Sequence, residues 1–153
     1  MLPNDIKMID LILRHSQLSH RDFREVEMRG NDAFDYIRDL LSKTPGPRTV
    51  INGLKLLIGL AGQAAQNSAG PRLPEVFDVA STFTMHPELD VRTTAAHIMV
   101  FTLRILKGLG KGPDAVGGVA RVLNEVRSAL SAEPKAEQRE MLEETRAELE
   151  SQS

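Results

Sequence analysis

The sequence contains no cysteine, no tryptophan and few aromatic residues of any kind. Without cysteine the chain can form no disulfide framework, no thiolate nucleophile and no cysteine-rich zinc site. This composition fits the reducing cytoplasm, where we expect the protein to act. Aromatic residues make up only 4 % of the chain, which disfavours the binding of single-stranded nucleic acid by base stacking.

The sequence also lacks a strong net charge and a long apolar run. Its 19 basic and 21 acidic residues give a formal net charge of -2, so no overall field draws it to nucleic acid or to an anionic membrane. The most apolar segment, residues 50–66, is interrupted by Lys55 and is too short to cross a bilayer. The first residues are interrupted by Asp5, Lys7 and Asp10, unlike the central run of a signal peptide. We therefore expect a soluble protein that does not enter a membrane.

No segment has the strict alternation of polar and apolar residues that a strand requires, which predicts an all-α protein without a sheet. Proline and glycine recur about every 20 residues, the spacing expected between helices of four or five turns. This punctuation predicts about seven helices in a single domain over residues 1–153, enough to bury about 70 % of the surface of the unfolded chain. The expected helices cover residues 4–15, 20–42, 48–67, 73–85, 87–108, 113–130 and 134–150.

The second expected helix has a clear beginning but an ambiguous interior. Ser19 stands three residues before Asp22, as in a capping box, and Leu18 and Phe23 occupy the positions of a hydrophobic staple. The apolar phase continues through Gly30. The pattern therefore allows either one long helix or a break at RGND.

Three pairs of the expected helices share an apolar pattern that repeats at about 43 or 44 residues. The first helices carry Phe34, Ile37 and Leu40, then Phe77, Ala80 and Phe83, then Ala120, Leu123 and Val126. The second helices carry Leu54, Leu57 and Ala61, then Ile98, Phe101 and Ile105, then Leu142, Thr145 and Leu149. Because this spacing is close to twelve helical turns, helices of similar phase match in part by chance, so the pattern indicates a repeat without proving one.

The stretch HPELDVRTTAA resembles the corner of a HEAT repeat, in which a short acidic turn with a proline leads into Val-Arg and a helix of small residues. His86 stands where that family most often has aspartate, and Pro87 is the turn proline. Val91 and Arg92 take the Val-Arg positions. The match runs through the corner without a gap.

The resemblance covers one helix pair, residues 73–108, whereas residues 31–67 and 113–150 follow only by periodicity and residues 1–30 would cap the stack. TPGPRTV and AEPKAEQ depart from the motif, so the flanking pairs fit an armadillo-like repeat or a generic helical hairpin equally well. The resemblance implies a short right-handed α-solenoid of about three antiparallel helix pairs. Proteins of this family most often hold another macromolecule, and the fold does not itself imply an enzyme. The charged last helix would act as a cap, with a coiled-coil seam as the alternative.

The polar residues of the corner have a structural explanation. Proline is favoured at the first position of a helix, the preceding histidine can cap it, and acidic residues in the first turn interact favourably with the helix dipole. No two of the four histidines have the i, i+4 spacing of a helical zinc motif. We therefore predict a structural corner and neither a metal site nor a cofactor; its residues are His86, Pro87, Asp90, Val91 and Arg92.

Two polar ridges on the second helices form the candidate binding surface. Their residues follow steps of three or four opposite an apolar face and should point away from the core. One ridge contains Arg48, Asn52, Lys55 and Gln63, and the other contains Thr93, His97, Val100, Arg104, Lys107 and Lys111. The ridges do not occupy equivalent repeat positions, and ordinary solvated helix faces are the alternative interpretation.

The sequence carries no local catalytic motif, which favours a non-enzymatic binding module. We predict a scaffold or adaptor that binds another protein through the second helix of each pair. One alternative is a nucleic-acid-binding protein that uses the mildly basic ridge, whose affinity would fall steeply with salt. The second alternative is an enzyme whose site is assembled from distant helices.

Overall fold

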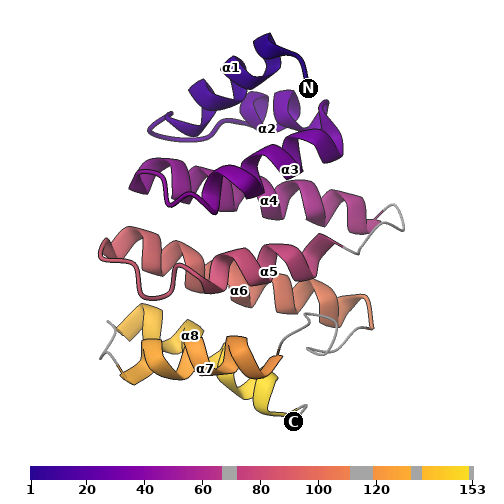
Figure 1. Cartoon of the computed structure of the whole chain (residues 1–153). Helices are drawn as coiled ribbons and strands as arrows, with labels where there is room; N and C mark the ends of the chain where they lie inside the picture. Colours follow the sequence, from indigo (N-terminus) through magenta and orange to yellow (C-terminus); the bar gives the residue numbers. More distant parts are fainter. Residues whose placement is uncertain (67–71, 111–118, 132–135, 152–153) are drawn as a thin grey trace.

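The computed structural model describes residues 1–66, 72–110, 119–131 and 136–151. Within these ranges the chain forms eight α-helices and no strand, which confirms the prediction of an all-α protein (Figure 1). The helices are α1 Pro3–Leu13, α2 His20–Glu27, α3 Gly30–Leu41, α4 Pro47–Gln66, α5 Leu73–Ser81, α6 Leu89–Gly108, α7 Val119–Ser131 and α8 Ala136–Glu150.

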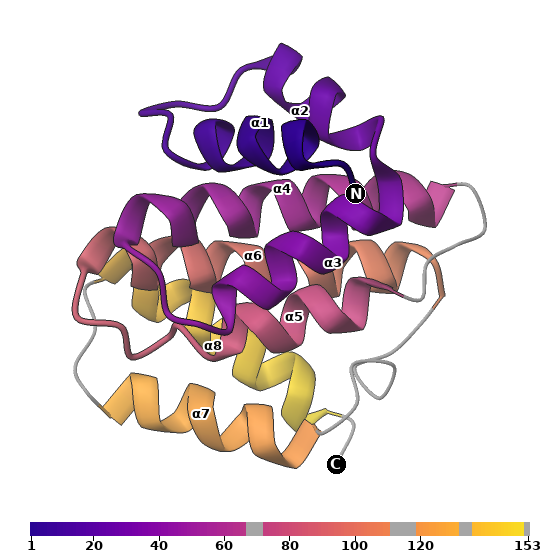
Figure 2. The ribbon, with the colours of Figure 1, turned by 45° about the horizontal axis from the view of Figure 1, so that its top comes forward.

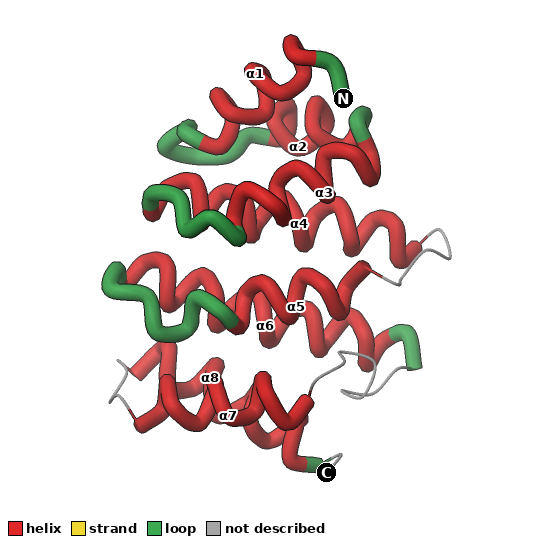
Figure 3. Tube along the Cα trace, in the orientation of Figure 1, coloured by secondary structure: helices red, strands yellow, loops and turns green. Residues whose placement is uncertain are grey.

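The structure contains one helix more than the seven expected, because the second expected helix has the break that the sequence left open and is divided into α2 and α3 (Figure 3). Gly30 has a φ of 55°, a left-handed conformation that interrupts a right-handed helix and that glycine adopts without strain. The side chain of Arg29 holds the junction: its Nη1 donates to the Glu25 carbonyl at 2.6 Å, and its Nη2 lies 3.1 Å from Asp5 Oδ1 in α1. The break allows α2 to pack against α4 instead of extending α3.

The predicted capping box at the start of α2 is present. Ser19 Oγ accepts the Asp22 N–H at 3.1 Å, and Asp22 Oδ2 accepts the Ser19 N–H at 3.0 Å. His15 Nδ1 lies 3.0 Å from the same carboxylate oxygen, which connects the end of α1 to the start of α2. The two residues of the predicted staple, Leu18 and Phe23, pack partly buried against the core.

The helices lie in successive layers. Figure 1 shows α1 with α2, then α3 with α4, α5 with α6 and α7 with α8. Helix α4 contacts α6, and α6 contacts α8, so these three helices form a row. Helices α3 and α5 lie together on one side of that row (Figure 2).

The buried apolar side chains form one cluster that runs from Ile9 in α1 to Leu149 in α8. The residues of the predicted apolar stripes that lie in it are Phe34, Ile37, Leu54, Leu57, Ala61, Phe77, Ala80, Phe83, Ile98, Leu123, Val126, Leu142 and Leu149. Two residues of α6 are on the opposite side from the one predicted: Phe101 is 43 % exposed, and Val100 is only 1 % exposed. Helix α6 packs against α4, α5 and α8, so apolar residues surround most of it and its periodicity does not single out one face.

The corner before α6 is a structural turn, but the helix begins two residues later than predicted. Pro87 therefore precedes the helix instead of occupying its first position, and His86 does not cap it. Nδ1 of His86 accepts the N–H of Glu88 at 3.0 Å. Arg92 Nη1 donates to the carbonyls of residues 86 and 87 at 2.8 and 3.0 Å, so these oxygens bind a guanidinium instead of helical amides. Val91 is buried, and Asp90 lies in the first turn as expected.

Candidate functional site

An apolar groove with a volume of about 440 Å³ lies where α2, α4 and α6 meet. This volume is within the range of sites that bind ligands or partner side chains. The described residues that line it are Phe23 from α2, Lys55, Ile58 and Gly59 from α4, and Thr94, His97, Ile98 and Phe101 from α6. The groove thus uses two neighbouring second helices and one helix of the amino-terminal pair.

The wall contributed by α2 depends on a close approach between helices. A Cβ atom added at Gly59 would lie 3.0 Å from Cε1 of Phe23, which is tighter than ordinary van der Waals contact. Glycine at this position lets the phenyl ring lie directly against α4. The capping box and the break at Gly30 set the direction of α2, so both help to place this ring.

The opposite wall is built around Phe101, which exposes 43 % of its surface. Its ring centroid lies 6.0 Å from that of His97 at an interplanar angle of 41°. The guanidinium carbon of Arg104 lies 5.7 Å from the Phe101 centroid, within the range of a cation–π contact. An exposed aromatic ring held by neighbours on its own helix is a preorganised apolar contact surface.

The described lining of the groove contains one lysine and no acidic residue. Lys55 is exposed on α4, and among the described residues it makes no ion pair. A ligand with a carboxylate is therefore favoured over one with an amine, because opposite charges across an interface steer association and suppress wrong partners.

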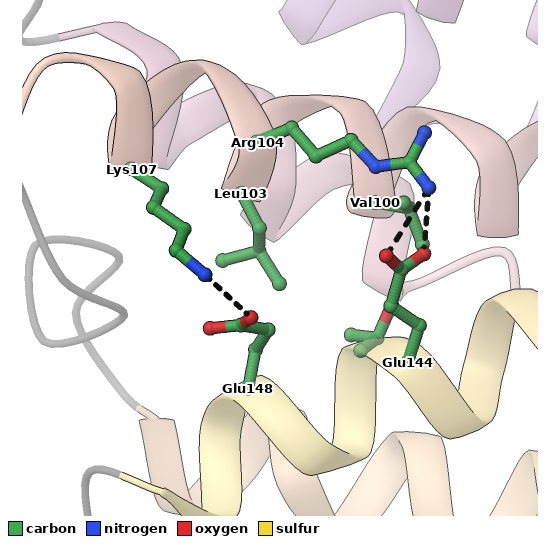
Figure 4. A pocket seen from close by; sticks show the side chains of 7 residues that line it. Val100, Leu103, Arg104, Lys107, Glu144 and Glu148 are labelled. Atoms are coloured by element: carbon green, nitrogen blue, oxygen red, sulfur yellow. Dashed lines mark hydrogen bonds and ion pairs between the residues drawn. The ribbon is translucent and has the colours of Figure 1, made fainter.

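The structure brings Lys55 and His97 of the two predicted ridges together in this groove, but it places Arg104 and Lys107 elsewhere. These two line a smaller cleft of about 90 Å³ between α6 and α8. Figure 4 shows both cations facing carboxylates of α8. Arg104 Nη2 lies 3.1 and 3.0 Å from the two carboxylate oxygens of Glu144, and Lys107 Nζ lies 3.5 Å from Glu148 Oε1.

The prediction that Asn52 belongs to the exposed ridge is wrong. Asn52 is 1 % exposed, and its amide nitrogen donates to the carbonyls of Leu13 and His15 at 2.9 and 2.8 Å. The sequence pattern treated this polar residue as solvated, whereas α1 covers this part of α4 and leaves carbonyls at its carboxyl end for the amide to satisfy. Arg48 is exposed as predicted, and Lys111 lies outside the described residues.

Ionisable groups with displaced pKa values lie at helix–helix contacts outside the groove lining. Burial raises the pKa of Asp22, but hydrogen bonds from Ser19 and His15 outweigh it and leave the pKa below its ordinary value. Burial and the hydrogen bond to Asp10 raise the pKa of Tyr36 to about 12. These groups fasten α1 to its neighbours, and their positions indicate a structural role.

The residues that the structure describes contain no group of three or more histidine, aspartate or glutamate side chains placed to hold a metal ion. No described helix is both long and apolar enough to cross a bilayer.

The groove itself offers apolar contact, one lysine, one histidine and one threonine hydroxyl, which suits binding.

The chain matches no protein-family model, no curated protein and no solved structure. Its function is therefore inferred from the groove and the surface around it.

Proposed function

We propose that this protein is a non-enzymatic module that binds another protein, acting as a scaffold or adaptor in the cytoplasm. Its architecture would be a short right-handed α-solenoid of the HEAT or armadillo kind. The layered helix pairs of Figure 1 and the corner tied by Arg92 support that proposal. In such stacks the second helices present a continuous surface to a partner, because each repeat contacts only its neighbours.

The observation that carries the proposal is the exposed Phe101 in a groove between two consecutive second helices. Complete burial of a phenylalanine side chain contributes about 1.5 to 3 kcal/mol, so covering the exposed part of this ring is worth about 1 kcal/mol. Phenylalanine is also among the residues enriched at protein interfaces, and hot spots cluster in pockets that a partner closes off from water. Covering this ring is thus a specific source of affinity.

Nucleic-acid binding is the weaker candidate. Arg104 and Lys107 are two of the cations of the predicted basic ridge, and both are paired with carboxylates of α8. A phosphate backbone would have to displace Glu144 and Glu148 before it gained these contacts. Binding dominated by phosphates depends on released counterions and weakens steeply with salt, which gives a simple experimental distinction.

The test is affinity capture from a cell lysate with the wild-type chain, with Phe101→Ala and with Leu109→Ala. Leu109 is the matched control, because it is 44 % exposed at the end of α6 but does not line the groove. We expect to capture proteins whose binding resists nuclease treatment. Their capture should fall about fivefold or more with Phe101→Ala and stay unchanged with Leu109→Ala. Capture that is unaffected by Phe101→Ala, or that nuclease abolishes, would contradict the proposal. Thermal unfolding of each variant verifies that it is folded.

A further inference from the structure

We infer that the groove between α2, α4 and α6 accepts an amphipathic α-helix of the partner protein, with apolar side chains entering the groove and a carboxylate reaching Lys55. This inference rests on the proposed function and specifies the class of segment that is bound. Three observations carry it: the length of the groove, the state of the backbone in its walls and the charge of its rim.

The length of the groove matches two turns of helix. On α6 the lining residues run from Thr94 to Phe101 in helical steps, a distance of about 10 Å at the rise of an α-helix. A partner helix places its apolar side chains at positions i, i+3 or i+4, and i+7, which cover the same length. Two or three side chains of such a helix therefore fit along the groove at once.

The backbone of the walls disfavours the main alternative, an extended strand. The lining residues of α4 and α6 lie inside helices Pro47–Gln66 and Leu89–Gly108, where backbone amides and carbonyls bond within the same helix. An extended segment gains much of its affinity from backbone bonds to a sheet edge, and the described walls offer no such edge. Its own backbone groups would lose water without gaining partners, which is costly. A helix satisfies its backbone internally and avoids that cost.

The charge of the rim selects an acidic helix. Lys55 is exposed and makes no ion pair within the described part of the chain, and none of the described lining residues is acidic. A glutamate or aspartate beside the apolar stripe of the partner would face this ammonium. A basic helix would meet repulsion from Lys55.

The molecule contains an internal example of the same mode of contact. Helix α8 meets α6 with Glu144 and Glu148, four residues apart on one face, and these carboxylates bind the two cations of α6 (Figure 4). Leu142 and Leu149 of α8 are buried in the core. An acidic amphipathic helix is therefore already accommodated on one face of α6, and the groove provides an apolar surface with Lys55 along another face.

The test is a display selection against the wild-type chain with two libraries. One library randomises the exposed face of a helix held in a stable helical hairpin, and the other displays linear peptides with frequent proline. Binders are then measured against Phe101→Ala, Lys55→Glu and the control Lys43→Glu, whose lysine is exposed and does not line the groove.

We expect the helical library to yield binders that are enriched in acidic residues. These binders should lose affinity about fivefold or more with Phe101→Ala. With Lys55→Glu their affinity should fall about three- to tenfold at low salt, and by less at about 0.5 M salt. Replacing the peptide glutamate by lysine should restore the affinity for the Lys55→Glu variant. Lys43→Glu should change affinity by less than about twofold.

Three outcomes would overturn the inference. If proteins captured from lysate depend on Phe101 but only linear or basic peptides bind the groove, the proposed function stands and the acidic helix is wrong. If the helical binders depend on Phe101 but show no acidic enrichment and no response to Lys55→Glu, the charge assignment is wrong. If lysate capture itself does not depend on Phe101, the proposed function fails, and this inference fails with it.

Discussion

Replacement of Asn52 by alanine should strongly destabilise the protein, although the residue is polar and lies on a helix face that was predicted to be solvated. Its amide donates to the carbonyls of Leu13 and His15. The first bond is buried and the second is partly buried. Leaving a buried carbonyl without its donor costs about 1 to 3 kcal/mol, and a typical partly exposed bond contributes about 0.5 to 1.5 kcal/mol. We therefore expect a loss of about 2 to 4 kcal/mol in the free energy of unfolding.

The assay is urea denaturation followed by circular dichroism. With a slope of about 2 kcal/mol per molar urea, the predicted loss lowers the midpoint by about 1 to 2 M. Arg48→Ala is the control, since Arg48 is exposed one turn earlier on the same helix, and we expect a change of at most about 0.5 kcal/mol. Asn52→Ala within about 0.5 kcal/mol of wild type would refute the reasoning that these bonds hold α1 on α4.

Three further predictions concern helix contacts. Gly62→Ala should stabilise the protein by up to about 1 kcal/mol, because the nearest neighbour of an added Cβ lies at 4.0 Å. Gly59→Ala should not stabilise it, because the added Cβ would press on the phenyl ring of Phe23 in α2. Urea denaturation of both variants measures the difference. Because the pKa of Asp22 is lowered in the folded protein, its carboxylate stabilises the fold fully above about pH 4, and this stabilisation is lost as pH falls through the folded-state pKa. Asp22→Asn should therefore be less stable than wild type at neutral pH, and its stability should decline less steeply below pH 4. An acid unfolding profile identical to that of wild type would contradict this role. The side chains of Arg104 and Glu144 are about half exposed, so a double-mutant cycle should give a coupling free energy below about 1 kcal/mol for this ion pair. A coupling free energy above about 2 kcal/mol would contradict this expectation and show that the ion pair is a major structural contact.

The parts of the fold that local chemistry controls could be predicted from the sequence. Proline and glycine mark the ends of the helices, and the spacing of Ser19 and Asp22 predicts the capping box that the structure contains. The break at Gly30 could not be decided, because the apolar phase runs through it and the left-handed φ of that glycine is set by how α2 packs. The start of α6 was displaced by two residues because Arg92 binds the two carbonyls that an earlier start would have used.

The candidate site was predicted only in part, because helix faces were assigned from one helix at a time. Lys55 and His97 do lie together, but Asn52 is covered by α1, and Phe101 was placed in the core by its repeat position although it is 43 % exposed. Helix α6 has neighbours on three sides, so the face left open depends on where α8 and α2 pack. That information lies in tertiary contacts and not in periodicity.

The most direct test of the proposed binding groove is hydrogen exchange of the protein with and without a partner captured from lysate. We predict that binding slows exchange in two segments, residues 55–59 of α4 and residues 94–101 of α6, with little change in α7. The segments should lose this protection together when Phe101→Ala is used at the same concentrations. Protection confined to other helices, or unchanged protection in the Phe101→Ala variant, would contradict the assignment of the groove as the binding site.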